Sequence, residues 1–146
     1  MKTSLLIALL ALRLARPVLA AEPPPAEVVL LDHAKVDAAF AKGMMLMQNS
    51  SYKILAGRRV MPGVVEIHDH DTDVFYILEG TATFVTGGTA VEPKAESPGE
   101  IRAKEITGGV AHQLTKGDVI VIPSGIPHRF TEVSGTFLYF VVKVTK

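Results

Sequence analysis

Residues 66–80 read EIHDHDTDVFYILEG, a stretch in which charged and imidazole side chains lead directly into an apolar segment that ends on glycine. Within residues 66–73, four carboxylates alternate with two histidines. Repulsion between carboxylates so close together is unfavourable unless water solvates them or a cation neutralises them. The function of the chain depends on which of these two conditions holds.

The segment VVEIHDH at 64–70 predicts a β-strand. Side chains two residues apart lie on the same face of a strand. Glu66, His68 and His70 are therefore expected to point in the same direction. Two imidazoles and one carboxylate would then share a single face.

A second strand is expected after a turn at residues 71–72, and Asp73 is the first residue on one face of that strand. The same face continues with Phe75 and Ile77, which are core-forming residues. A carboxylate at the end of a buried apolar row is costly unless a cation or hydrogen-bond donors compensate it. Asp73 is therefore a second indication of a bound cation.

The segment GDVIVIPSGIPHRF at 117–130 places His128 directly after a predicted strand and a turn rich in proline and glycine. A site built from His68, His70, Asp73 and His128 would suit a divalent transition metal, because imidazole nitrogen and carboxylate oxygen bind Fe, Mn, Ni, Co, Cu or Zn. Such a ligand set leaves coordination positions open for water or a substrate.

From residue 44 onward the periodicity is that of strands, which predicts an all-β domain at 44–146. Segments rich in β-branched and aromatic residues alternate with clusters of Gly, Pro, Asp and Ser, and no helical segment intervenes. VFYIL, VIVI and FLYFVV are apolar on both faces, so both faces must be covered. The helix expected at 31–43, the 44–60 strand and a second subunit in a homodimer are the candidates for the outer cover.

Residues 63–80 and 117–132 resemble the two motifs of the cupin superfamily. The second motif is matched by Gly117, Pro123, Gly125 and His128, with Glu132 where the family has asparagine. The resemblance implies a double-stranded β-helix, which is a small jelly-roll barrel, with a short N-terminal helix outside it.

The first cupin motif is matched by His68, His70 and Gly80, with Asp73 in place of the family's glutamate. Spacing allows a second register, in which Glu66 and His68 occupy the two histidine positions. The resemblance thus implies a metal held by His68, Asp73 and His128 together with His70, or alternatively Glu66. Phe75, Ile77 and Phe130 are expected to form the cavity wall.

The N-terminal residues predict export to the periplasm or the extracellular space. Lys2, an apolar run at 5–12 and the small residues of VLA at 18–20 together indicate a signal peptide over 1–20. The apolar run is too short to span a membrane after processing. A proline-rich linker at 21–30 follows, and then a helix at 31–43 with Asp32 as its N-cap and Gly43 at its end.

Composition excludes several function classes. A formal net charge of zero gives no electrostatic footprint for nucleic acid, and the absence of cysteine excludes thiolate metal sites and disulfides. The charged, glycine-rich stretch at 86–109 predicts a hairpin with an extended, exposed loop.

Two classes of function remain: a metal-dependent enzyme of the dioxygenase, isomerase or lyase type acting on a small molecule, and a small-ligand-binding protein with a structural metal or none. Open coordination positions favour the enzyme. No further histidine, cysteine or tyrosine is visibly placed in the sequence as a general acid or base, which favours the binding protein.

Overall fold

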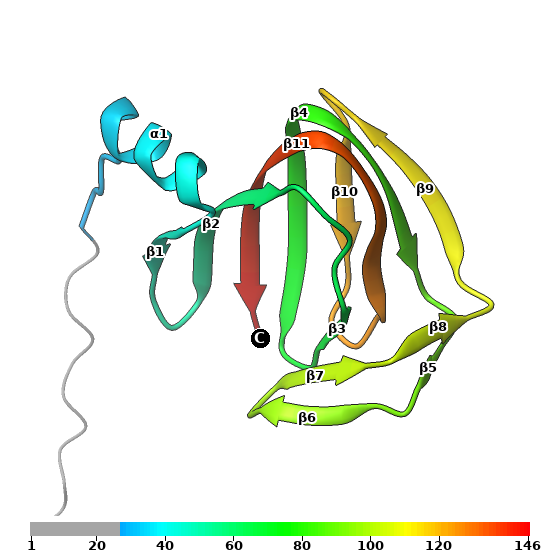
Figure 1. Ribbon diagram of the computed structural model, residues 1–146. Coiled ribbons are helices and arrows are strands. Elements are labelled where there is room, and N and C mark those ends of the chain that lie inside the picture. The colour runs from blue at the N-terminus through cyan, green and yellow to red at the C-terminus, as the bar shows by residue number, and fades with distance from the viewer. Residues whose placement is uncertain (1–26) are drawn as a thin grey trace, which may run out of the picture.

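The computed structural model describes residues 27–146, so the signal peptide predicted at 1–20 and the linker as far as residue 26 lie outside the described residues. Within that range one short helix precedes the strands (Figure 1). The elements are α1 (His33–Lys42), β1 (Met45–Gln48), β2 (Tyr52–Arg59), β3 (Val65–His68), β4 (Asp71–Thr86), β5 (Thr89–Val91), β6 (Lys94–Ser97), β7 (Glu100–Ala103), β8 (Glu105–Thr107), β9 (Val110–Thr115), β10 (Val119–Ile122) and β11 (His128–Thr145).

The two longest strands, β4 and β11, form the frame of the barrel. They pair antiparallel from one end to the other, with Thr145 opposite Asp71 and His128 opposite Thr86. β4 also pairs with β9 and β10, and β11 pairs with β2 and β3, so the two long strands join these strands into one curved sheet of nine strands (Figure 1). The predicted all-β jelly-roll fold with a short N-terminal helix is confirmed.

Gly80 allows β4 to bend near the middle of its length. VFYIL and TATFV, which the sequence presented as separate segments, are halves of this one strand. Gly80 has a φ of 81°, and the pairing register with β11 shifts between Ser134 and Leu138. A Cβ atom at Gly80 would lie 2.5 Å from the carbonyl oxygen of Thr136, so no other residue fits there without displacing the backbone.

The turn before β4 lies two residues earlier than expected. The sequence pattern placed it at 71–72, whereas the chain bends at 69–70 and Asp71 already belongs to β4. The bend is held by the backbone N–H of Asp69, which donates to Gly99, and by that of Lys146, which donates to the carbonyl of His70. As a result, β3 ends at His68, and His70 does not share its face.

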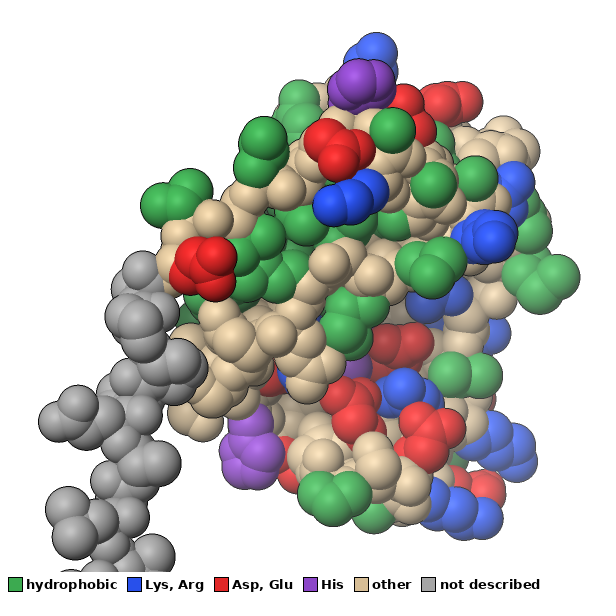
Figure 2. All heavy atoms as spheres, turned by 90° about the vertical axis from the view of Figure 1, so that its left-hand side faces the viewer, with side chains coloured by type: hydrophobic (Ala, Val, Ile, Leu, Met, Phe, Trp, Pro, Cys, Tyr) green, Lys and Arg blue, Asp and Glu red, His purple; other side chains and the backbone are tan. Residues whose placement is uncertain are grey.

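The helix α1 lies outside the barrel, beside β1 and β2 (Figure 1). Its N-cap Asp32 accepts a hydrogen bond from the backbone N–H of Lys35, and Gly43 ends it in the left-handed conformation. Figure 2 shows the side of the molecule that carries α1: hydrophobic side chains gather in its upper part, around the helix, and charged side chains gather lower down. No helix among residues 27–146 combines the length and apolar character needed to cross a membrane.

The outer face of the β4–β10 pair remains exposed in the described chain. Val119 lies opposite Tyr76, and Val121 lies opposite Val74. The exposed fractions of Val119, Val121 and Tyr76 are 61%, 56% and 46%. The helix reaches only the far end of this face, where Val36 and Phe40 share a groove with Leu78 and Leu138.

The stretch 86–109 does more than form the exposed loop expected from its composition. It contains two antiparallel ribbons, β5 with β8 and β6 with β7. β7 is half-buried and pairs with β3 along its whole length. This part of the chain therefore forms one wall of the barrel next to the strand that carries Glu66 and His68.

We predict that Gly80→Ala lowers the free energy of unfolding by about 2 kcal/mol or more, because the new methyl group meets the backbone of β11 and the residue keeps a positive φ. Gly135→Ala is the matched control, since Gly135 also has a positive φ, of 66°, but a Cβ atom there meets open space. It should cost only about 1 kcal/mol. Urea unfolding of both variants measures the difference, and equal losses would contradict the role assigned to the bend.

Candidate metal centre

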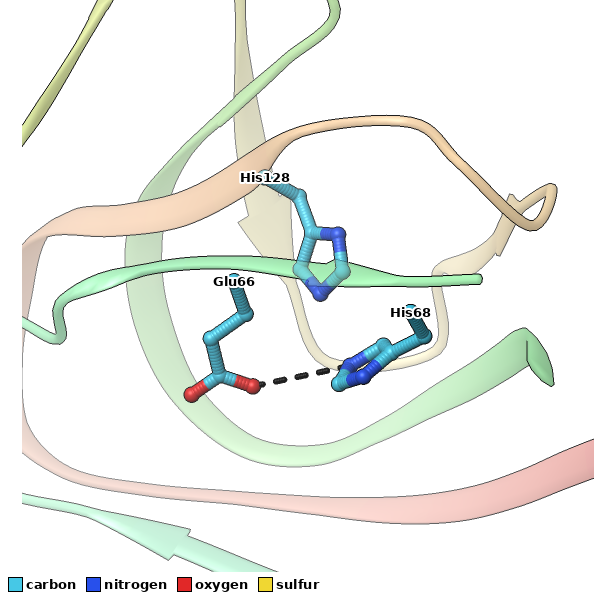
Figure 3. A group of neighbouring side chains, drawn as sticks. All are labelled: Glu66, His68 and His128. Carbon is cyan, nitrogen blue, oxygen red and sulfur yellow. Dashed lines mark ion pairs between the residues drawn. The ribbon is translucent and has the colours of Figure 1, made fainter. Parts of the chain in front are cut away.

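The pairing register of β3 brings the central side chains together. Glu66 on β3 lies directly opposite His128 on β11, and His68 lies opposite Glu100 on β7. Figure 3 shows the side chains of Glu66 and His68 from β3 and of His128 from β11 converging on one point. Residues far apart in the sequence thus meet because one four-residue strand lies between β11 and β7.

Glu66, His68 and His128 form a compact group of possible metal ligands. One carboxylate oxygen of Glu66 and one ring nitrogen of each histidine all lie within 4.8 Å of one another. The dashed line in Figure 3 marks the 3.6 Å between Glu66 Oε2 and His68 Nε2. Both histidines are buried, and the glutamate is half-buried.

The imidazole of His68 is oriented by a carboxylate from the neighbouring strand. Its Nδ1 lies 2.8 Å from Glu100 Oε2, so Nδ1 carries the hydrogen and donates it. Its Nε2 is buried and has no hydrogen-bond partner among residues 27–146, and it lies 3.6 Å from both Glu66 Oε2 and Asp73 Oδ2. A nitrogen lone pair that faces two carboxylates is unfavourable without a cation, so these residues fit a bound metal.

The imidazole of His128 presents its Nε2 in the same way. Its Nδ1 donates to the carbonyl oxygen of Ile126, at 2.9 Å, which leaves Nε2 without a hydrogen. Burial lowers the pKa of His128, against the hydrogen bond to the Ile126 carbonyl, which acts in the opposite direction. His128 is therefore neutral at pH 7, as a metal-binding imidazole must be.

Asp73 lies beside this group but is held by a lysine. Its side chain is only 2% exposed, and Lys143 Nζ lies 2.7 Å from each of its carboxylate oxygens. Asp73 is not a member of the compact ligand group.

His70 lies away from the group. Its side chain is exposed, and its ring lies against Gly99 on the ribbon between β6 and β7. Of the five ligands that the two registers offered, the structure thus brings Glu66, His68 and His128 together, with Asp73 adjacent.

A cavity of about 340 Å³ adjoins the ligand group. Its wall includes Phe75 and Phe130, as the sequence suggested, and also Phe84 and Tyr139. Ile77, the third residue expected in the wall, is fully buried in the core and does not line the cavity. Glu66 and His128 also line it, so a molecule in the cavity would reach the ligand group.

Arg59 and Tyr139 supply polar groups inside this cavity. Arg59 Nε donates to the Tyr139 hydroxyl at 3.2 Å, and the guanidinium lies 3.4 Å from Glu66 Oε1 and over the ring of Phe130. Arg58 is exposed and lines both this cavity and the groove beside α1. Burial raises the pKa of Tyr139, against the opposing effect of Arg59, so its hydroxyl stays protonated at neutral pH.

Sequence reasoning missed Glu100, Lys143 and Tyr139. Glu100 lies in a stretch whose composition indicates a surface loop, and no local signal distinguishes it from the other acidic residues there. A signal did exist for the other two, because Tyr139 and Lys143 alternate with outward-facing residues in FLYFVVKV. A lysine on the inward face of a core strand indicates a buried partner.

Comparison with families of known proteins matches residues 46–146 to the family described as Cupin. The match covers more than half of the chain and includes every residue of the ligand group. The chain therefore belongs to the cupin family. No curated protein matches it.

Solved structures share the fold at low sequence identity. Hydroquinone 1,2-dioxygenase PnpCD in complex with Cd²⁺ and 4-hydroxybenzonitrile is 14% identical over 83% of this chain and 80% of its own, with a TM-score of 0.58. The protein BH2720 of Bacillus halodurans is 13% identical over 84% of both chains, also with a TM-score of 0.58.

The DMSP lyase DddQ of Ruegeria pomeroyi is 18% identical over 67% of this chain, with a TM-score of 0.48, and this chain spans 40% of the lyase. At these identities the likeness is one of fold.

We predict that His68 and His128 are both protonated at Nδ1 and not at Nε2 in the metal-free protein at pH 8, because Glu100 and the Ile126 carbonyl accept from Nδ1. Long-range ¹H–¹⁵N spectra of the imidazole rings report the tautomer. Glu100→Ala should shift His68 toward the Nε2–H form and leave His128 unchanged. Glu96→Ala is the control, because it removes the same charge from the same ribbon without touching His68. An Nε2–H signal from His68 in the unaltered protein would contradict the assignment.

Proposed function

We propose that the chain binds a divalent transition metal through Glu66, His68 and His128 and acts as a metal-dependent enzyme on a small molecule. The observation that carries the proposal is the buried Nε2 of His68, which faces two carboxylates without a hydrogen-bond partner among the described residues. A cation at this point would relieve the repulsion between the carboxylates and the ring nitrogen. Of the four acidic residues in this stretch, only Glu66 would bind the cation, because Asp71 and Asp73 pair with lysines and Asp69 is exposed.

Two histidines and one carboxylate are a set of protein ligands that leaves several coordination positions open. Bound there, a metal would supply Lewis acidity or an oxygen-binding centre to a substrate in the cavity. Fe, Mn, Ni, Co, Cu and Zn all accept these donor atoms.

The chain's own residues would bind and orient the substrate. The aromatic side chains of Phe75, Phe84 and Phe130 favour an apolar or aromatic body, and the neutral hydroxyl of Tyr139 can donate a hydrogen bond to a substrate oxygen. Arg59 holds that hydroxyl in place. Tyr139 is thus the acid–base group that the sequence had not revealed, and its position favours an enzyme.

A binding protein without catalysis is the second candidate. The contacts of Arg59 with Tyr139 and Glu66 favour it, because they give these polar groups of the cavity partners within the protein. The fold shared with a dioxygenase whose structure holds Cd²⁺ and a hydroxylated aromatic nitrile supports the enzyme. We propose in addition that the protein is exported, on the basis of residues 1–20.

We predict that His68→Ala and His128→Ala each reduce the bound metal to trace levels while the β-rich circular dichroism remains. Glu66→Gln should weaken metal binding at least about tenfold, because it removes the charged ligand. Elemental analysis and competition with a chelator measure both effects.

His70→Gln is the matched control, since it alters a histidine four residues from Glu66 whose side chain lies outside the group. It should bind metal as the unaltered protein does. A larger loss in His70→Gln than in Glu66→Gln would show that the register with His70 as a ligand holds in solution.

We also propose that two copies of the chain join through the outer face of β4 and β10. Val74, Tyr76, Val119 and Val121 form adjoining cross-strand pairs with no charged side chain among them. A surface of this kind suits an identical surface across a two-fold axis, and apolar patches on soluble proteins commonly mark interfaces.

We predict that the protein lacking residues 1–20 has the mass of a dimer by light scattering at micromolar concentration, and that Val119→Lys with Val121→Lys has the mass of one chain. Two buried lysines would face two others across the axis, which is unfavourable. Val110→Lys is the control, because Val110 is equally exposed, at 62%, but lies on β9. A single-chain mass before any substitution would overturn the proposed interface.

A further inference from the structure

Asp73 and Glu66 are both carboxylates beside His68, but the basic side chains that pair with them make different contacts. Lys143 lies directly opposite Asp73 in the pairing of β11 with β4, and its Nζ lies 2.7 Å from both carboxylate oxygens. Arg59 contacts only Oε1 of Glu66, at 3.4 Å. Glu66 Oε2 and Asp73 Oδ2 both lie 3.6 Å from His68 Nε2, but only Asp73 Oδ2 also accepts a hydrogen bond from a lysine.

We propose that Lys143 keeps Asp73 out of the metal's ligand set, so that the centre has three protein ligands. The inference rests on the proposed metal site and specifies its coordination. Asp73 occupies the position of the carboxylate ligand in the sequence motif. In this chain the ion pair with Lys143 would prevent the residue at that position from binding the metal.

Geometry supports the exclusion of Asp73. The ligand atoms of Glu66, His68 and His128 all lie within 4.8 Å of one another, and Asp73 does not belong to that group. An aspartate side chain is also one carbon shorter than the glutamate of the motif. Asp73 Oδ2 is as close to His68 Nε2 as Glu66 Oε2 is, so what excludes Asp73 is its place relative to the whole group. To coordinate, Asp73 would have to give up charge-assisted hydrogen bonds with Lys143, which are strong at this distance.

Burial makes the pair hard to separate. The side chain of Asp73 is 2% exposed and that of Lys143 is 13% exposed. Separating two such charges leaves each of them poorly solvated, which is costly in a protein interior. Lys143 also lines the cavity, so it holds Asp73 from the side on which a substrate would bind.

Removal of the lysine should therefore recruit Asp73. With a neutral side chain at position 143, Asp73 remains a buried carboxylate 3.6 Å from the Nε2 of His68. A metal bound at that nitrogen would then be the nearest available cation. The centre would gain a fourth protein ligand and lose one open position.

The test is a titration of the full chain with Co²⁺, followed by visible absorption, whose bands report the number and type of ligands. The unaltered protein and Asp73→Asn should give the same absorption bands and similar affinity. Lys143→Met should bind Co²⁺ about tenfold more tightly with altered bands. Lys143→Met combined with Asp73→Asn should restore the original bands.

Lys53→Met is the matched control. Lys53 forms the same kind of pair with Asp71, at 2.7 Å, and lies opposite Lys143 on β2. Its removal takes away the same charge near the site without freeing Asp73. Its absorption bands should match those of the unaltered protein, which separates recruitment of a ligand from a general electrostatic effect.

Each possible result supports or overturns the proposed role of Lys143. Altered bands and an affinity loss of about tenfold in Asp73→Asn alone would show that Asp73 is a ligand in the native protein and overturn the inference, while the metal site would stand. Unchanged bands in folded Lys143→Met would overturn it as well. If Lys143→Met does not fold by circular dichroism, Asp73→Asn alone decides. Absence of Co²⁺ binding to the unaltered protein would instead reject the metal site itself.

Discussion

The register of β3 between β11 and β7 is the constraint on which the rest of the site depends. β3 has only four residues, yet it places Glu66 opposite His128 on one side and His68 opposite Glu100 on the other. A slip of one residue would turn every side chain of the strand to the opposite face. Val65 and Ile67, buried on the other face, oppose such a slip, so apolar packing fixes the position of the polar group.

The inner face of the barrel also depends on pairing its charges. Lys143 with Asp73, Lys53 with Asp71 and Arg59 with Glu66 form a row of ion pairs across β2, β4, β11 and β3. Buried pairs of this kind add little to stability compared with apolar packing, whereas the loss of one partner is costly. Together these pairs neutralise acidic residues in and beside the ligand group, and Lys143 with Asp73 is the most buried of the three.

The fold and the two histidines could be predicted from the sequence, whereas the contacts around them could not. His68 and His128 lie in motifs with fixed spacing, and strand periodicity indicated which way they point. Strand parity also placed His70 with Glu66, because it assumed a strand that continues to residue 70. The bend at 69–70 depends on Gly99 and Lys146, which lie far along the chain. Glu100 depends on the pairing of β7, for which composition gives no signal.

The long-range pairing of β11 has a consequence for how the protein folds. β11 pairs with residues of β2 that lie about 80 to 90 positions earlier and with residues of β4 that lie about 40 to 75 positions earlier. Contacts at such separations form slowly, because a long loop of chain must close before they are made. Until β11 docks, β2 and β4 present open edges, and His128 is absent from the group. Assembly of the Glu66, His68 and His128 group should therefore be a late event in folding, and the chain is most prone to aggregate just before it.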